Sequence, residues 1–198
     1  MAKVYLALYK GKKTGRSPKA LGARFVDWVI RKITRSPYSH CEIAVPVSDS
    51  SGLFDCYSSS FRDGGVRIKR MRLPSDKWDL IELDSPDMVY GRLQMLWAQT
   101  KWMPYDLVGA LCVNSFFRRI WLKQSAAKWF CSEWCGDVMG MPWPSLCSPQ
   151  DLADSIRGGK SKESGGVPSY CRKTTGTPVK VEQMTRGRRL SDVMQTNR

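Results

Sequence analysis

The chain has 198 residues, 42% hydrophobic and 25% charged, which is enough for one globular domain with a substantial core. Its formal net charge of +14 predicts attraction to polyanions such as nucleic acid, anionic lipid or the acidic polymers of a bacterial envelope, without selecting a substrate. The apolar runs fall far short of the roughly 20 residues that span a bilayer, so no transmembrane segment is predicted.

The cysteine pattern is that of a reduced protein. Seven cysteines are present, an odd number, and their spacing does not form the framework of a small disulfide scaffold. The first residues, MAKVYLALYKGKK, lack the features of a secretory signal peptide. We therefore expect free thiols and a cytoplasmic location at synthesis.

The first half of the chain predicts one helix and five strands. Residues 4–9 are rich in strand-forming side chains, and from Ala20 to Ile33 apolar residues recur at three- and four-residue steps, which indicates an amphipathic helix. A Ser-Pro pair then ends this helix. Four further strands, separated by turn residues, are predicted at residues 40–47, 53–57, 66–71 and 78–83. Together these strands suggest an antiparallel meander.

The second half is predicted to be helical and then irregular. Two or three helices are expected over residues 86–122, one from Phe130 to Gly140, and a short one from Pro149 to about Ile156. Residues 158–198 are rich in Gly, Ser, Thr, Lys and Arg, a composition that buries too little apolar surface to offset its ordering entropy. The expected organisation is therefore an α+β domain over residues 1–157 and a basic C-terminal tail over residues 158–198, flexible unless a partner holds it.

A thiol site is the main chemical hypothesis. The chain contains one histidine, so any mechanism that uses imidazole depends on His40, at the start of a predicted strand. Cys131 lies at the start of a predicted helix, where the helix dipole and the first backbone amides lower a thiol pKa from about 8.5. The same amides are able to stabilise a developing oxyanion. Cys131 is therefore the candidate nucleophile and His40 the candidate base.

The other cysteines and the aromatic residues are interpreted as packing groups. Free cysteine is among the most buried residue types, and most of the eight tryptophans have the spacing of core residues. Zinc bound by Cys131, Cys135, His40 and Cys41 is disfavoured, because structural zinc sites normally present two closely spaced ligand pairs and no Cys-x-x-Cys occurs. No Walker loop, dinucleotide fingerprint or calcium loop is present, so no metal and no cofactor is predicted.

Two short strings resemble the signature blocks of the circularly permuted papain-like amidases, relatives of the NlpC-type cell-wall hydrolases. These are Thr-Arg-Ser-Pro-Tyr-Ser-His at residues 34–40 and Phe-Cys-Ser-Glu at residues 130–133. In that family the histidine precedes the cysteine, as here. Two further blocks are similar and fall in the same order, residues 53–56 with 64–66 and residues 104–106. The resemblance covers roughly residues 30–140, and residues 58–67 look similar to small members encoded by tailed phages.

The resemblance implies a permuted papain-like fold, with a short antiparallel sheet packed against helices and the nucleophile at a helix N-terminus. It assigns Cys131 as nucleophile and His40 as base. For the residue that orients the histidine it points to Asp55, on the following strand. Glu42 is the alternative, and we prefer Asp55 because residues two apart on one strand seldom point at each other closely enough to hold an imidazole.

Two tyrosines are candidates for contacts with the oxyanion or the substrate. Tyr105 and Tyr38 each carry a hydroxyl close in sequence to a resembling block. For Tyr38, packing with a satisfied hydroxyl is the preferred interpretation. The chain also departs from the family pattern, because its first strand lacks the Gly-Asp pair often found there and Trp134 and Cys135 replace small aliphatic residues after the nucleophile.

The implied activity is cleavage of an amide bond through a thioester intermediate. Peptides, peptidoglycan stem peptides and acyl amides are the implied substrates, of which peptidoglycan is preferred for a basic protein of phage-like character. Two rivals stay open: a virion-associated interaction protein that retains the scaffold with little catalysis, and a basic nucleic-acid-binding protein. In each, the basic tail is available to an anionic polymer or a virion protein.

Overall fold

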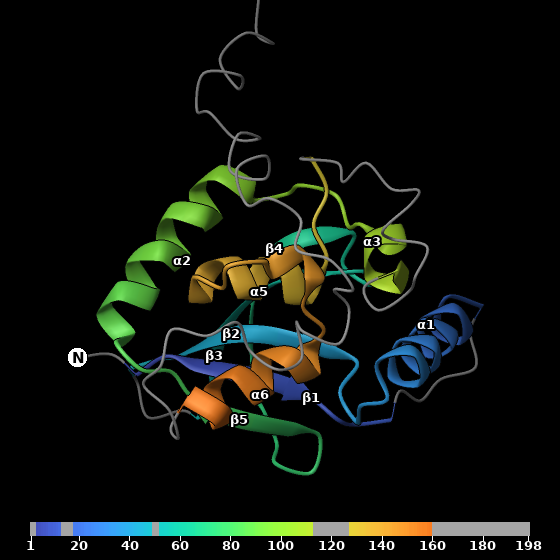
Figure 1. Cartoon of the computed structure of the whole chain (residues 1–198), viewed down its shortest axis with the longest axis horizontal. Coiled ribbons are helices and arrows are strands. Elements are labelled where there is room, and N and C mark those ends of the chain that lie inside the picture. Colours follow the sequence, from blue (N-terminus) through green and yellow to red (C-terminus); the bar gives the residue numbers. More distant parts are fainter. Residues whose placement is uncertain (1–2, 13–17, 49–51, 113–126, 160–198) are drawn as a thin grey trace, which may run out of the picture. The chain divides into compact units, whose positions relative to one another are not determined.

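The computed structural model describes residues 3–12, 18–48, 52–112 and 127–159, all of which fall within one structural unit, Met1–Glu163. The chain is an α+β protein in which a five-stranded antiparallel sheet packs against several helices, as Figure 1 shows. The expectations for residues 113–122 and almost all of the tail lie outside the described residues. The fold class is thus confirmed at the level of α+β.

The sheet has the strand order β4-β3-β2-β1-β5. Its members are β1 (Tyr5–Tyr9), β2 (His40–Pro46), β3 (Phe54–Ser60), β4 (Gly65–Met71) and β5 (Trp78–Glu82). The five predicted strands are confirmed, with β3 longer than expected. The predicted meander is correct from β2 to β4 and wrong for β5, which returns across the sheet to pair with β1, placing Tyr5 opposite Glu82 and Tyr9 opposite Trp78.

The pairing of β5 with β1 has a physical reason. β1 contains three residues that are 0% exposed, Leu6, Ala7 and Leu8, and a buried strand needs hydrogen-bond partners on both edges. β2 covers one edge and β5 the other. The outer edge of β4 is bonded instead to the chain after α2, because Val66 N donates to the Met103 carbonyl at 2.9 Å and Trp102 N donates to the Val66 carbonyl at 3.1 Å.

Five α-helices and one 3-10 turn are described. They are α1 (Pro18–Thr34), α2 (Pro86–Thr100), α3 (Leu107–Cys112), α5 (Cys131–Met139), η1 (Pro144–Leu146) and α6 (Pro149–Gly159). α5 begins one residue after the predicted start and ends where Gly140 adopts a left-handed conformation with φ 74°, which favours glycine. The predicted limits of this helix are therefore confirmed to within one residue.

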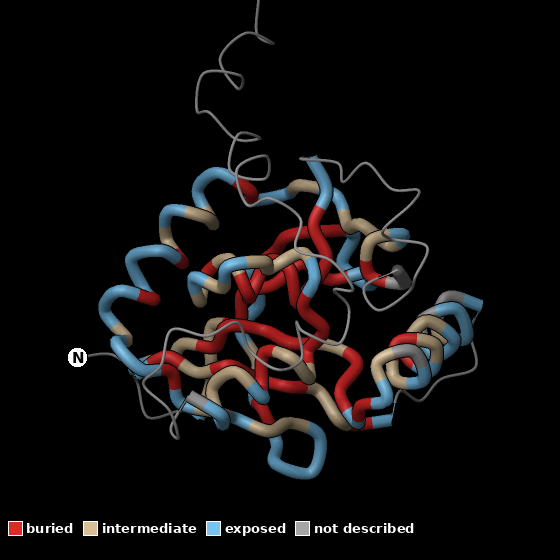
Figure 2. The backbone as a smooth tube through the Cα atoms, viewed as in Figure 1, coloured by how far each residue is buried: buried red, intermediate tan, exposed pale blue. Residues whose placement is uncertain are grey.

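The main core lies between the sheet and helices α2, α5 and α6 (Figure 2). Strand alternation assigns the two faces of the sheet, since Leu6, Leu8 and Ile43 belong to this core whereas Ala7 and Ala44 belong to a small cluster on the opposite face. Glu42 has the same parity as Ala44. The sheet therefore carries α5 on one face and the Glu42 side chain on the other.

Trp134 anchors α5 within this core. Its side chain is 0% exposed, and its indole Nε1 donates a 2.9 Å hydrogen bond to Oγ1 of Thr100 at the end of α2. The chain before α5 is fixed as well, because Ser59 of β3 donates its hydroxyl to the Trp129 carbonyl at 2.7 Å. These contacts determine where α5 begins relative to the sheet.

We expect Trp134→Ala to lower the free energy of unfolding by about 3 to 5 kcal/mol, because it leaves a large cavity and removes the hydrogen bond from the indole to the Thr100 hydroxyl. Equilibrium urea unfolding followed by circular dichroism measures the change. The matched control is Trp102→Ala, at a side chain 75% exposed, which should change stability by less than about 1 kcal/mol. Equal effects of the two substitutions would contradict the anchoring role of Trp134.

Candidate active site

Cys131 is the first residue of α5 and is 3% exposed. α5 packs against β2 and β3, so the N-terminal turn of the helix meets the sheet near the start of β2. At this position the thiol lies close to the backbone amides of the first helical turn and to the positive end of the helix dipole. The predicted placement of Cys131 at a helix N-terminus is confirmed.

The surroundings of Cys131 favour its thiolate. Hydrogen bonding to the Cys41 thiol lowers the pKa of Cys131, burial opposes this, and the His40 imidazole and the Cys41 backbone lower it further, with the net pKa well below its usual value. Burial raises the pKa of the Cys41 thiol well above its usual value, and hydrogen bonds to Cys131 and Cys135 raise it further. Cys41 therefore remains a protonated donor beside an ionised Cys131.

His40 lies between the thiol and a carboxylate. Its Nε2 is 3.1 Å from Oε1 of Glu42, which leaves Nδ1 as the ring nitrogen for Cys131. Burial lowers the pKa of His40, but hydrogen bonds and charge interactions with Cys131 and Glu42 outweigh it and raise the pKa to about 9. Both shifts favour a thiolate at Cys131 paired with an imidazolium at His40.

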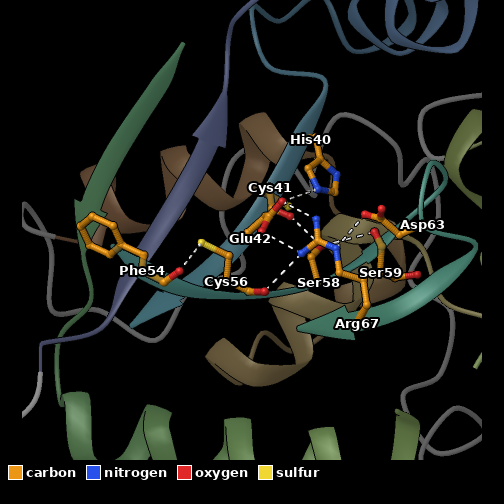
Figure 3. A network of polar contacts seen from close by, with 9 residues as sticks. All are labelled: His40, Cys41, Glu42, Phe54, Cys56, Ser58, Ser59, Asp63 and Arg67. Carbon is orange, nitrogen blue, oxygen red and sulfur yellow. Dashed lines mark hydrogen bonds and ion pairs between the residues drawn. The ribbon is translucent and has the colours of Figure 1, made fainter. Parts of the chain in front are cut away.

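Glu42 is held in turn by Arg67. The carboxylate accepts a bidentate pair of bonds, 2.9 Å from Nη1 to Oε2 and 2.8 Å from Nη2 to Oε1, as Figure 3 shows. Glu42 is 1% exposed, and although burial raises the pKa of its carboxyl, hydrogen bonds from Arg67 and His40 lower it to about 2. The carboxylate is therefore ionised at neutral and mildly acidic pH.

Arg67 is itself fixed on three sides. Its Nε donates to Oδ2 of Asp63 at 2.8 Å, and its Nη1 also donates to the Cys56 carbonyl at 3.2 Å (Figure 3). Asp63 comes from the turn between β3 and β4, and Arg67 from β4. The network Asp63, Arg67, Glu42, His40 thus runs across three strands and ends at the imidazole.

The structure does not bring Asp55 to the histidine, and the preference for Asp55 over Glu42 as the neighbour of His40 is wrong. Asp55 pairs in register with Val45, so its side chain lies on the sheet face opposite to that of Glu42. There it forms a surface ion pair with Arg70, with its Oδ1 2.7 Å from Nε. Glu42 reaches His40 although the two are only two residues apart, because Arg67 fixes the orientation of the carboxylate.

The two candidate tyrosines have different surroundings. Burial raises the pKa of Tyr105 well above its usual value, and the charge of Cys131 and a hydrogen bond to it add to the shift, which places the phenol beside the thiol. Tyr38 is 4% exposed and donates its hydroxyl to Oδ2 of Asp79 at 2.7 Å, while Arg157 donates to the same hydroxyl at 3.3 Å. Tyr38 therefore links β5 to α6, as the packing interpretation predicts.

A glycine determines where Tyr105 lies. Gly65 opens β4 and forms a bridge with Pro104, and a Cβ at Gly65 would collide with the Met103 backbone. The close approach allows Tyr105 N to donate to the Gly64 carbonyl at 3.0 Å. Tyr105 also forms a bridge with Trp129, two residues before Cys131, so one segment positions both Tyr105 and Cys131.

A pocket of about 130 Å³ opens onto this site. Its lining includes His40, Glu42, Arg67 and Tyr105, together with Phe61, whose ring contacts Tyr105 edge to face with the centroids 5.7 Å apart. Cys131 does not line the pocket. A molecule in this pocket therefore contacts His40 and Tyr105 before it reaches the sulfur.

Two members of the site were not assigned by the sequence. Cys41 was interpreted as a packing thiol, although its position next to His40 on the same strand was a signal that it faces the helix side. Arg67 was not singled out by the sequence, and its position between Val66 and Ile68 did not reveal that it is 8% exposed. The register decides the position of Arg67. It places Arg67 of β4 opposite Ser58 of β3, and β3 lies next to β2, which carries Glu42.

Within the described ranges, no group of three or more His, Cys, Asp or Glu side chains is arranged to hold a metal ion. The same residues contain no helix with the length and apolarity to cross a membrane. No family model, curated protein or solved structure matches the chain. Fold and geometry define an α+β protein in which a half-buried imidazole contacts a buried carboxylate and interacts with a buried thiol.

We expect Arg67→Gln to destabilise the protein by about 3 to 5 kcal/mol, because it leaves the Glu42 carboxylate buried without its bidentate partner. Urea unfolding at neutral pH measures the loss. The control is Arg70→Gln, which breaks the ion pair to Asp55 at a side chain 57% exposed and should cost less than about 1 kcal/mol. If both substitutions cost the same, Arg67 does not support the site.

His40 is the one histidine of the chain, so its titration can be followed by NMR without assignment ambiguity. The imidazole should remain protonated on raising the pH through 6.5 and lose its proton only near pH 9. In Cys131→Ala the midpoint should fall, because burial still favours the neutral ring and the partner thiolate is gone. A midpoint near 6.5 in the unmodified protein would contradict the ion pair.

Proposed function

We propose that this protein is a thiol hydrolase in which Cys131 is the nucleophile, His40 the proton carrier and Glu42 the residue that orients the imidazole. The observation that carries the proposal is the interaction of the Cys131 thiol with His40, whose Nε2 lies 3.1 Å from a buried Glu42 carboxylate. A nucleophile, a base and an orienting group in contact are what covalent catalysis by a thiol requires.

The mechanism begins from the ionised pair. The Cys131 thiolate attacks the substrate carbonyl, and His40 donates its proton to the departing amine or alcohol as the tetrahedral intermediate collapses to a thioester. Neutral His40 then accepts a proton from water, which attacks the thioester carbonyl and releases the acid. The Cys131 thiolate leaves, and the ion pair with the imidazolium is restored.

Charge on the intermediate also needs stabilisation. The backbone amides at the start of α5 lie where such an oxyanion would form, and donors of this kind contribute roughly 3 kcal/mol each in other enzymes. Tyr105 is a further donor, since its phenol lies beside the sulfur and keeps its proton at neutral pH. Tyr38 is engaged with Asp79 and takes no part in this step.

The arrangement also supports the proposed kinship with permuted papain-like amidases. A histidine at the start of a strand, followed in sequence by a cysteine at the start of a helix across the sheet, is the order that the resemblance implies. Peptides, peptidoglycan stem peptides and acyl amides are the proposed substrates. A pocket of about 130 Å³ is suited to a narrow chain at the scissile bond rather than to a bulky group.

A second candidate function is a scaffold with little or no catalysis, such as a virion-associated interaction protein. The observation that favours it is the burial of Cys131, which at 3% exposed has little surface open to a substrate. In that case Cys131, Cys41 and Cys135 serve as core thiols. Reactivity of Cys131 separates the two functions.

We expect iodoacetamide near neutral pH to modify Cys131 faster than any other of the seven cysteines, because its surroundings favour the thiolate. Mass-spectrometric peptide mapping over time measures the rates. Substituting His40→Ala should abolish the selectivity, whereas Cys56→Ser, at a buried cysteine with a raised pKa, should leave it intact. Slow and uniform labelling of all seven would reject the hydrolase and favour the scaffold.

The activity itself is tested with three substrates: purified peptidoglycan, a fluorogenic peptide amide and a fluorogenic acyl amide. At least one should be cleaved with transient acylation of Cys131, visible as a mass increase on the intact protein. Cys131→Ser should lower the rate of cleavage by several orders of magnitude. Glu42→Gln should also lower this rate and should raise the proportion of neutral His40. Reactive Cys131 without turnover of any of the three would identify a thiol site outside these substrate classes.

A further inference from the structure

Helix α1 exposes large apolar side chains to solvent. Leu21 is 50%, Phe25 65% and Trp28 55% exposed, and their spacing of four and three residues places them on one face of the helix. The rings of Phe25 and Trp28 stack, with centroids 6.2 Å apart and planes at 29°. Adjacent exposed apolar groups of this size indicate a surface that meets another apolar phase.

The charged residues of α1 also differ between its inner and outer sides. Its sequence contains one acidic residue, Asp27, which is 8% exposed and bonded to Arg31 at 3.0 Å and to the Ser39 hydroxyl. Lys32 and Arg35, by contrast, are exposed. The negative charge of the helix is therefore turned inward and neutralised, and its outer surface is basic.

A shallow pocket lies at the C-terminal end of this surface. Its volume is about 490 Å³, and its lining consists of Trp28, Arg31, Lys32, Arg35 and Ser36. Three cations and an aromatic ring around an open hollow match the chemistry of a phosphate-bearing lipid headgroup, with the ring at the level of the headgroups. Apolar residues, an aromatic ring and basic residues thus follow one another along this surface. Such a surface can contact both the acyl chains and the phosphates of a membrane.

We propose that the outer surface of α1, formed by Leu21, Phe25, Trp28, Lys32 and Arg35, binds the surface of an anionic lipid bilayer. The apolar side chains enter the boundary of the headgroups and acyl chains while the basic side chains contact the phosphates. A nucleic acid would use the cations but has no groups that require Leu21 and Phe25. A second copy would bring two basic surfaces together, which charge repulsion opposes.

The position of α1 connects this surface to the candidate site. Val26 and Ile30, on the inner side of the helix, line the same pocket as His40 and Glu42. Arg31 fixes the helix to the sheet by donating to the Gly11 carbonyl at 2.8 Å and the Lys10 carbonyl at 3.2 Å. A protein bound to a bilayer through α1 thus presents the pocket close to the lipid, whether or not the thiol is catalytic.

The test is cosedimentation of the full chain with vesicles of phosphatidylcholine, with and without phosphatidylglycerol. The protein should bind only the anionic vesicles, and Phe25→Ala/Trp28→Ala should weaken binding about tenfold or more. The double substitution Lys32→Gln/Arg35→Gln should also weaken it and reduce its dependence on salt. The matched control is Met88→Ala/Met95→Ala, which removes two side chains 60% and 65% exposed on α2 and should leave binding unchanged.

Circular dichroism and urea unfolding verify that each variant remains folded, and Cys131→Ala should bind vesicles as the unmodified chain does. Vesicle binding is therefore expected even if Cys131 is not catalytic, and a lack of vesicle binding would not contradict the hydrolase proposal. Equal binding to both vesicle types, or equal loss in the α2 control, would overturn the proposal. So would binding of duplex DNA that depends on Lys32 and Arg35, not on Phe25 and Trp28, with no binding to vesicles.

Discussion

Glu42 carries a carboxylate that is 1% exposed, and a buried charge of this kind is stable only when its partners replace the water that it has lost. Arg67 supplies two of these bonds and His40 a third contact at 3.1 Å. Because the buried carboxylate is stable only with these hydrogen bonds, Arg67 and His40 have to lie within reach of it. The positions of β2 and β4 in the sheet meet this condition, with the guanidinium on one side of the carboxylate and the imidazole on the other. The orientation of the imidazole, and with it the chemistry of Cys131, depends on this buried ion pair.

The sheet separates the two halves of the site. Glu42 and Arg67 lie on one face, whereas Cys41 and α5 lie on the other, and His40 at the very start of β2 is the point where the two meet. A histidine in mid-strand would be confined to one face. Its terminal position lets the ring contact the carboxylate through Nε2 and the thiol through its other nitrogen. The proposed membrane surface of α1 lies beside the same pocket, which the inner side of that helix lines.

Local signals were sufficient for most of the elements. Alternating apolar residues identified β1 to β4, and Gly140 with the prolines after it identified the end of α5, because these signals act between neighbours in the chain. The partner of β5 was not predictable in this way. Leu80 and Ile81 indicate a strand, but nothing in them distinguishes the edge of β4 from that of β1. The choice depended on which edge the buried β1 left open and on the segment around Met103 that covers β4.

The candidate site shows the same division. The sequence by itself determined that imidazole chemistry must use His40 and that Cys131 begins a helix, because a single histidine and a helix start are properties of the chain itself. Only the tertiary structure decided that Glu42 and not Asp55 meets the ring. The two carboxylates lie on neighbouring strands, and the face that each one occupies depends on strand register. Register is set by pairing across the sheet, where Arg67 lies 25 residues from Glu42 in the chain and 2.8 Å from it in space.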